Sequence, residues 1–168
     1  AHALYGLLYG LQMGIGSSAR DMAVLMNLNQ NGQSIVLSRA IAAAGVKDGA
    51  GLAALMREQP RRYTFGHTFP TGNHAMFLCY WLAAAGIDPL TQTQLVTVPP
   101  SQMPANLEAG HMDGFCAGEP WSRRAVIEAS GVLAAPSSQV WPDHPGKALG
   151  ARADFVARHP NTCRALVA

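Results

Sequence analysis

The chain has 168 residues, of which 49% are hydrophobic and 13% are charged, and its formal net charge is +2. This length suits one ordinary domain or two small lobes, and the apolar content is sufficient for a packed core. Without a run of Lys or Arg, binding of nucleic acid through a basic patch is not expected. The longest apolar stretch, residues 76–86, is shorter than the roughly 18 residues that a membrane-spanning helix needs.

The first sixty residues predict helices separated by short strands. Residues 2–12 form an apolar, glycine-spaced pattern typical of a helix. Two strand-like runs follow within residues 21–37, around the sequence NQNG, which indicates a hairpin or a bend. Residues 38–45 predict a helix closed by Gly45, and residues 49–59 predict another that ends before Pro60.

A regular alternation of strand and helix begins near residue 62. Strands are predicted at 62–69, 94–100 and 113–120, and helices at 72–86, 101–110 and 120–131. Gly86 is expected to terminate the first of these helices, Ser101 to cap the second, and Pro120 to lie near the first turn of the third. Such alternation predicts right-handed crossovers and a mainly parallel sheet. Residues 135–147 form the longest irregular stretch, and it leads into a strand-like run at 147–155.

His74 stands near the start of the helix at 72–86, in a segment that is otherwise apolar. Backbone N–H groups have no partners in the first turn of a helix, and anions bind there. His74 and Gly118 each follow a predicted strand, so we expect them at the same edge of one sheet, where ligands of such sheets bind. The alternative is a histidine that only caps the helix or lies at the surface.

Three further residues have the chemistry of anion donors. Gln33 follows the NQNG turn, Gly118 lies where a strand ends and the backbone can approach a ligand, and Lys147 stands among two prolines and a glycine. Each also has an ordinary interpretation, as a solvated turn residue, a strand-to-helix turn and a surface lysine. Glu119 is expected to cap the following helix.

Other chemistry finds little support in the sequence. Five acidic and histidine side chains lack any recognised metal-ligand spacing: His67, His111, His144, Asp113 and Asp143. The three cysteines, at 79, 116 and 163, are widely spaced and lack an activating pattern, and there is no G-x-S-x-G. We therefore expect no metal, no cofactor and no enzymatic activity.

Several segments, in order, resemble the nitrate-binding branch of the solute-binding proteins of ABC transporters. They are LNQNGQSI, TFPTGNH, YWLAAAGIDP, VPPSQMPANLEAGHMDGFCAGEPW, VWPDHPGKAL and RADFVARHP. The resemblance implies an α/β fold of the type II periplasmic-binding class, with two lobes around a cleft. We expect the chain to be an incomplete fragment of it, because both ends look cut. Residues 1–60 are then part of lobe 1, 61–118 the core of lobe 2, and 119–168 a crossover helix and return segment.

The resemblance also implies a nitrate site built from Gln33, His74, Gly118 and Lys147. The family's further tryptophan lies upstream of this chain, so the pocket of the isolated fragment is expected to be incomplete. Bicarbonate-binding relatives replace the His and Lys positions and recruit a metal, which His74 and Lys147 argue against.

The expected function is nitrate binding, with nitrite also considered, by the periplasmic or envelope-associated component of an importer that delivers the ion to membrane permease subunits. A cytoplasmic nitrate sensor of the same fold, acting through a regulatory protein, is the alternative. A third hypothesis, an enzyme that makes the thiamine pyrimidine, lacks the Cys and His cluster that such chemistry needs.

Overall fold

The computed structural model describes residues 14, 18–128 and 130–168, so the helix expected at 2–12 lies outside the described residues. The chain divides into two compact units. The sheet unit comprises residues 32–70 and 74–142, and the ribbon unit comprises the described residues up to Asn31, residues 71–73 and the chain from Asp143. These units cross the expected lobe boundaries at 60 and 118, and how they correspond to the lobes of a complete binding protein stays a prediction.

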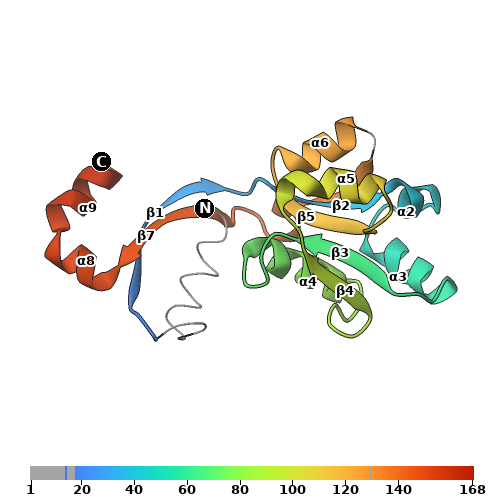
Figure 1. Ribbon diagram of the computed structural model, residues 1–168, viewed down its shortest axis with the longest axis horizontal. Coiled ribbons are helices and arrows are strands. Elements are labelled where there is room, and N and C mark those ends of the chain that lie inside the picture. The colour runs from blue at the N-terminus through green and yellow to red at the C-terminus, as the bar shows by residue number, and fades with distance from the viewer. Residues whose placement is uncertain (1–13, 15–17, 129) are drawn as a thin grey trace. The chain divides into compact units, whose positions relative to one another are not determined.

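The sheet unit is built on five strands in the order β4-β3-β5-β2-β6 (Figure 1). In chain order they are β2 (Gln33–Ser38), β3 (Tyr63–His67), β4 (Thr93–Thr97), β5 (Gly114–Gly118) and β6 (Gly131–Pro136). β3 is parallel to β4 and to β5, as the strand–helix alternation predicts. β2 is antiparallel to both β5 and β6, so the sheet is mixed at this side. Two of the four strand pairings in this sheet are therefore antiparallel, and the prediction of a mainly parallel sheet is wrong at β2.

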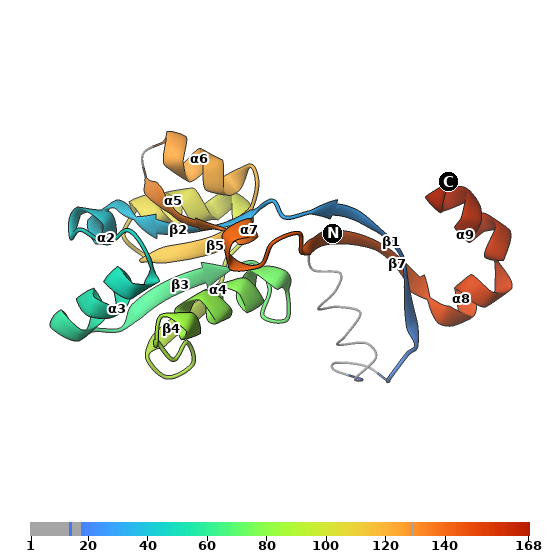
Figure 2. The same cartoon turned by 180° about the vertical axis from the view of Figure 1, so that it is seen from behind.

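Helices cover both faces of this sheet. They are α2 (Arg39–Ala43), α3 (Gly49–Glu58), α4 (Asn73–Ala84), the 3₁₀ turn η1 (Pro100–Gln102), α5 (Met103–Glu108), α6 (Trp121–Ile127) and α7 (Ser137–Val140). Figures 1 and 2 show α3 and α4 on one face and α5 and α6 on the other. On β2, Ile35 and Leu37 pack into the core on the α4 side, and Val36 packs into the core on the α5 side. This alternation is what a strand buried on both faces requires.

Local signals place most helix ends where the sequence predicts them. Gly45 and Gly86 take left-handed conformations just beyond α2 and α4, with φ of 87° and 78°. Ser38 Oγ accepts a hydrogen bond from Ile41 N at 3.3 Å and caps α2. The expected cap at Ser101 is wrong, because Ser101 lies inside η1, which Pro100 starts one residue earlier.

The ribbon unit pairs two strands that are far apart in sequence. β1 (Met22–Gln30) and β7 (Pro145–Arg152) form an antiparallel ladder, followed by α8 (Ala153–Arg158) and α9 (Pro160–Val167) (Figure 1). Asn31 and Gly32 adopt the positive φ values of 55° and 81° that the NQNG turn suggests. A hairpin does not form, because β2 is buried at every position and pairs with β5 and β6 instead of β1.

The stretch at 135–147 is more regular than expected, since it contains α7 and the start of β7. Among the described residues, no helix combines the length and the apolar character that crossing a bilayer demands.

Candidate anion-binding site

Gln33 and Gly118 lie opposite each other where β2 begins and β5 ends. The next pair outward is hydrogen-bonded, because Glu119 N donates to Gly32 O at 3.1 Å. Bonded and non-bonded pairs alternate in an antiparallel ladder, so Gln33 and Gly118 form a non-bonded pair, whose Cα atoms approach most closely. The ladder therefore places an amide side chain and a glycine side by side at one end of the sheet.

This pair faces the side of the sheet that α4 covers. Residues two apart on a strand share a face, and Ile35 on β2 and Cys116 on β5 belong to the core under α4. A Cβ added to Gly118 would lie 3.6 Å from His74 Nε2. Gln33, His74 and Gly118 thus meet at the same end of the same sheet face, and the prediction that His74 and Gly118 share an edge is confirmed.

The backbone N–H of Gly118 points away from β2, because it belongs to a non-bonded pair of that ladder. On its other side β5 pairs with β3 at Gly114 and Phe115, before the strand reaches Gly118. The N–H therefore points into the region beyond the end of β3, where a ligand can accept its hydrogen bond.

The side chain of Gln33 is buried, with only 3% of the residue exposed. Its Oε1 and Nε2 both lack a hydrogen-bond partner within the part of the chain that the structure describes. The backbone N of Gln33 donates to Ser137 Oγ at 3.3 Å, so the residue itself is anchored. An unpaired buried amide costs about 1–3 kcal/mol, and a ligand that bonds to it recovers that cost.

His74 is the second residue of α4 and is fully buried. Its Nδ1 lies 2.6 Å from Thr68 Oγ1, and Thr68 directly follows β3. Sequence reasoning found His74 from its place at a helix start but missed Thr68. The available signal was a hydroxyl residue after a strand, six positions before the histidine.

The carboxylate nearest in sequence to this site is already engaged. Glu119 Oε2 accepts a hydrogen bond from Arg123 N at 3.0 Å in the first turn of α6, which confirms the expected capping role. Its Oε1 accepts from Ser34 Oγ at 3.4 Å. The positive end of the helix dipole offsets the charge of this carboxylate.

Lys147 belongs to the ribbon unit, where it lies on β7 opposite Asn29 of β1 and is exposed. Its neighbour Gly146 permits close packing of the two strands, because a Cβ there would lie 2.7 Å from Asn29 Oδ1 and 2.8 Å from Asn31 O. Asn31 N donates to His144 O at 2.9 Å and fixes the same turn. The convergence of Lys147 with the other three residues stays a prediction.

Other reactive side chains do not assemble into a second kind of centre. Burial raises the pKa of the Cys79 and Cys116 thiols, so neither is a ready nucleophile. Burial also lowers the pKa of His67, whose Nδ1 has no hydrogen-bond partner among the residues that the structure describes. Among the described residues, no three His, Cys, Asp or Glu side chains gather as metal ligands do.

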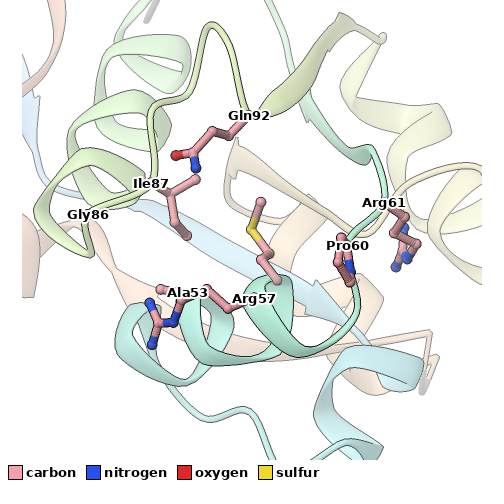
Figure 3. A pocket seen from close by; sticks show the side chains of 8 residues that line it. Ala53, Arg57, Pro60, Arg61, Gly86, Ile87 and Gln92 are labelled. Carbon is pink, nitrogen blue, oxygen red and sulfur yellow. The ribbon is translucent and has the colours of Figure 1, made fainter.

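A cavity of about 260 Å³ lies at the other end of β3, where that strand begins (Figure 3). Figure 3 shows Arg57 and Arg61 at separate sides of it. The Arg61 guanidinium donates to both carboxylate oxygens of Asp113, at 2.9 and 2.5 Å, and stacks 3.7 Å over the Tyr63 ring. The hydrogen bond to Asp113 raises the pKa of Arg61. Of the two arginines that line this cavity, Arg61 is therefore already neutralised by a carboxylate of the protein.

Comparison with known proteins identifies the family of the chain. Residues 1–168 match the NMT1-like family. The chain belongs to that family. It is 38% identical to a nitrate/nitrite-binding protein, NrtA, of Synechocystis sp. over 99% of this chain and 38% of that protein. It is 39% identical to the nitrate import ATP-binding protein NrtC of the same organism, over 99% of this chain and 25% of that protein. It is 40% identical to the bicarbonate transport ATP-binding protein CmpC, also of Synechocystis sp., over 84% of this chain and 21% of that protein.

Solved structures confirm the fold class. The crystal structure of the periplasmic nitrate-binding protein NrtA from Synechocystis superposes with a TM-score of 0.87 at 38% identity, covering 99% of this chain and 44% of that one. A ligand-binding component of an ABC-type import system from Staphylococcus aureus shows the same fold at 18% identity, with a TM-score of 0.74 over 96% of this chain and 51% of that one. The chain thus spans less than half the length of the nitrate-binding relatives that it matches.

Proposed function

We propose that the protein containing this chain binds nitrate as the substrate-binding component of an ABC-type importer and carries out no catalysis. The observation that carries the proposal is the buried Gln33 amide, without a partner in the described structure, on the sheet face where Gly118 meets His74 Nε2. The likeness to NrtA supports nitrate, with nitrite as a second ligand.

Nitrate fits these donors in shape and chemistry. It is planar, carries one negative charge and only accepts hydrogen bonds, so it needs several N–H groups that approach from different directions. The amide of Gln33, the imidazole N–H of His74 and the backbone N–H of Gly118 are such groups. Hydrogen bonds to an ion are about twice as strong as those between neutral groups, which offsets the dehydration of a small anion.

Lys147 is assigned the remaining role, which is to supply the full positive charge. Its ammonium has three donors and no acceptor, and it forms no ion pair within the described chain. The close packing at Gly146 holds the backbone of Lys147 in a defined place. In this proposal the lysine completes the anion site in the complete protein.

Bicarbonate is the main alternative ligand, because the relative CmpC is named as a bicarbonate transport protein. Bicarbonate has an O–H that must donate to an acceptor. The carboxylate of Glu119 is engaged by Ser34 and by Arg123 N, so Gln33 Oε1 is the acceptor that such an O–H would use. The other groups assigned to the site all donate, and this excess of donors favours an ion that accepts every hydrogen bond.

Isothermal titration of the complete protein with nitrate tests the proposal. Removing one hydrogen bond to an ion costs about 1.5–3 kcal/mol, so His74→Ala and Lys147→Ala are each expected to weaken binding by about 10- to 150-fold. Lys47→Ala, at an exposed lysine of the sheet unit, serves as the control and is expected to bind like the unmodified protein. Unchanged affinity in both test variants would contradict the site.

A nitrate sensor of the same fold is the second candidate. The match to NrtC and CmpC favours keeping this candidate, because the same segment also occurs in chains that are named as ATP-binding proteins and not as nitrate-binding proteins. A sensor is expected to release a regulatory protein when nitrate binds, whereas an importer component docks on permease subunits outside the cytoplasmic membrane. Pull-down of each partner with and without nitrate separates the two.

A further inference from the structure

We propose that Thr68 is a positioning residue for the anion: its hydroxyl donates to His74 Nδ1 and thereby keeps the proton of the neutral imidazole on Nε2, the nitrogen beside Gly118. The chain of contacts is short, since Thr68 Oγ1 lies 2.6 Å from Nδ1 and Nε2 lies 3.6 Å from the place of a Gly118 Cβ. The consequence for anion binding rests on the proposed function, but the protonation pattern of the ring does not.

The distance favours the hydroxyl as the donor. N–H···O bonds span about 2.7–3.2 Å between heavy atoms, and bonds that a hydroxyl donates to oxygen are shorter, at about 2.5–3.0 Å. The 2.6 Å between Thr68 Oγ1 and His74 Nδ1 is shorter than the N–H···O range. In this proposal the contact is an O–H···N bond in which Nδ1 is the acceptor.

The hydrogen-bonding needs of the Thr68 hydroxyl favour the same direction of the bond. Thr68 is half-buried, and within the described chain its hydroxyl makes one hydrogen bond, the contact with His74. If Nδ1 carried the proton, the imidazole would donate to Oγ1 and the hydroxyl hydrogen would need a different acceptor. With Nδ1 as the acceptor, one bond satisfies both the hydroxyl and a buried ring nitrogen.

The direction of this bond determines what the imidazole offers to a ligand. A neutral imidazole has one N–H and one lone pair, and the bond made by one nitrogen fixes the character of the other. Donation from Thr68 leaves Nε2 as the N–H, which attracts an anion oxygen. The opposite tautomer would present a lone pair to that oxygen and repel it. A neutral histidine thus serves as an anion donor without taking up a proton.

The ring itself is the first test. Nitrogen-15 NMR of the histidine-labelled complete protein at pH 7.5 reports which ring nitrogen carries hydrogen, and the spectrum of His74→Asn assigns the signal. We expect an unprotonated Nδ1 and a protonated Nε2. Loss of that pattern in Thr68→Val and its retention in Thr68→Ser support the inference. A proton on Nδ1 in the unmodified protein overturns it, whatever the protein binds.

Nitrate titration is the second test. Thr68→Val keeps the shape of the side chain and removes the hydroxyl, so we expect affinity to fall by about two- to twelvefold, the worth of one ordinary hydrogen bond. Thr68→Ser keeps the hydroxyl and is expected to stay within about twofold. Equal affinity in Thr68→Val and the unmodified protein overturns the positioning role. The predicted tautomer in a protein that binds no nitrate at all overturns the proposed function and leaves the assignment of the ring proton standing.

Discussion

The two ends of β3 differ in how their polar groups are used. Where the strand begins, Arg61 is engaged in a bidentate ion pair with Asp113 and stacks on Tyr63. Where the strand ends, Thr68 holds the buried His74, and the Gln33 amide on the same sheet face is buried without a partner in the described chain. The charged groups at the start of the strand are paired with each other, whereas the buried amide at its end has no hydrogen-bond partner in the described chain.

This difference separates a structural ion pair from the proposed binding site. A half-exposed ion pair such as Arg61–Asp113 is satisfied by its own partner and contributes little to recognition of a ligand. A buried amide without a partner lowers the stability of the empty protein, and a bound acceptor restores it. Net positive charge is therefore a poor guide to where a small anion binds in this molecule.

The largest expected effect comes from Gly118. A Cβ there meets only ordinary contacts, at 3.6 Å from His74 Nε2 and 3.7 Å from Gly32 O, so Gly118→Ala is expected to change the free energy of unfolding by less than about 0.5 kcal/mol. If the anion binds as proposed, the methyl group occupies part of its space, and we expect nitrate affinity in titration calorimetry to fall by about a hundredfold.

Gly114, on the same strand, provides the matched control for that substitution. A Cβ at Gly114 would lie 2.7 Å from Val36 O, so Gly114→Ala is expected to lower the free energy of unfolding by about 1–3 kcal/mol. If Gly118→Ala destabilises the protein as much as Gly114→Ala, or binds nitrate normally, the site is not beside Gly118.

Gln33→Leu is expected to have the next largest effect, with opposite signs on binding and stability. Replacing the unpaired buried amide by an apolar side chain of similar size is expected to raise the free energy of unfolding without anion by about 1 kcal/mol. The same change removes a donor and lowers nitrate affinity by about tenfold. Urea denaturation and calorimetry measure the two effects, and a loss of stability in the anion-free variant would show that the amide has a partner in the protein.

Arg57→Gln is expected to have the smallest effect. Arg57 lines the cavity where β3 begins, and its removal is expected to leave nitrate affinity within about twofold, as for a change outside a binding site. A loss of nitrate affinity as large as that of His74→Ala would place the anion at the start of the strand instead of its end.

Some helix ends and the position of His74 can be predicted from the sequence alone. The helix ends at Gly45 and Gly86 follow from backbone conformations that glycine adopts at no steric cost, and the place of His74 at the start of α4 follows from a strand followed by an apolar run. These are local signals, and each is legible within about ten residues of sequence.

Long-range pairing explains what the sequence did not reveal. Asn31 and Gly32 take hairpin-like conformations, yet β1 pairs with β7 and β2 with β5 and β6, because the choice of partner depends on burial across the whole unit. The role of Thr68 and the burial of the Gln33 amide depend on contacts with residues that no local pattern names. The position of Lys147 relative to these groups stays a prediction for the same reason.

The most direct test is a crystal structure of the complete protein grown with nitrate as the only added anion. We predict nitrate oxygens within hydrogen-bonding distance of the Gln33 amide, His74 Nε2, Gly118 N and Lys147 Nζ. Nitrate bound between Arg57 and Arg61, with Gln33 and His74 turned away from it, would contradict the account.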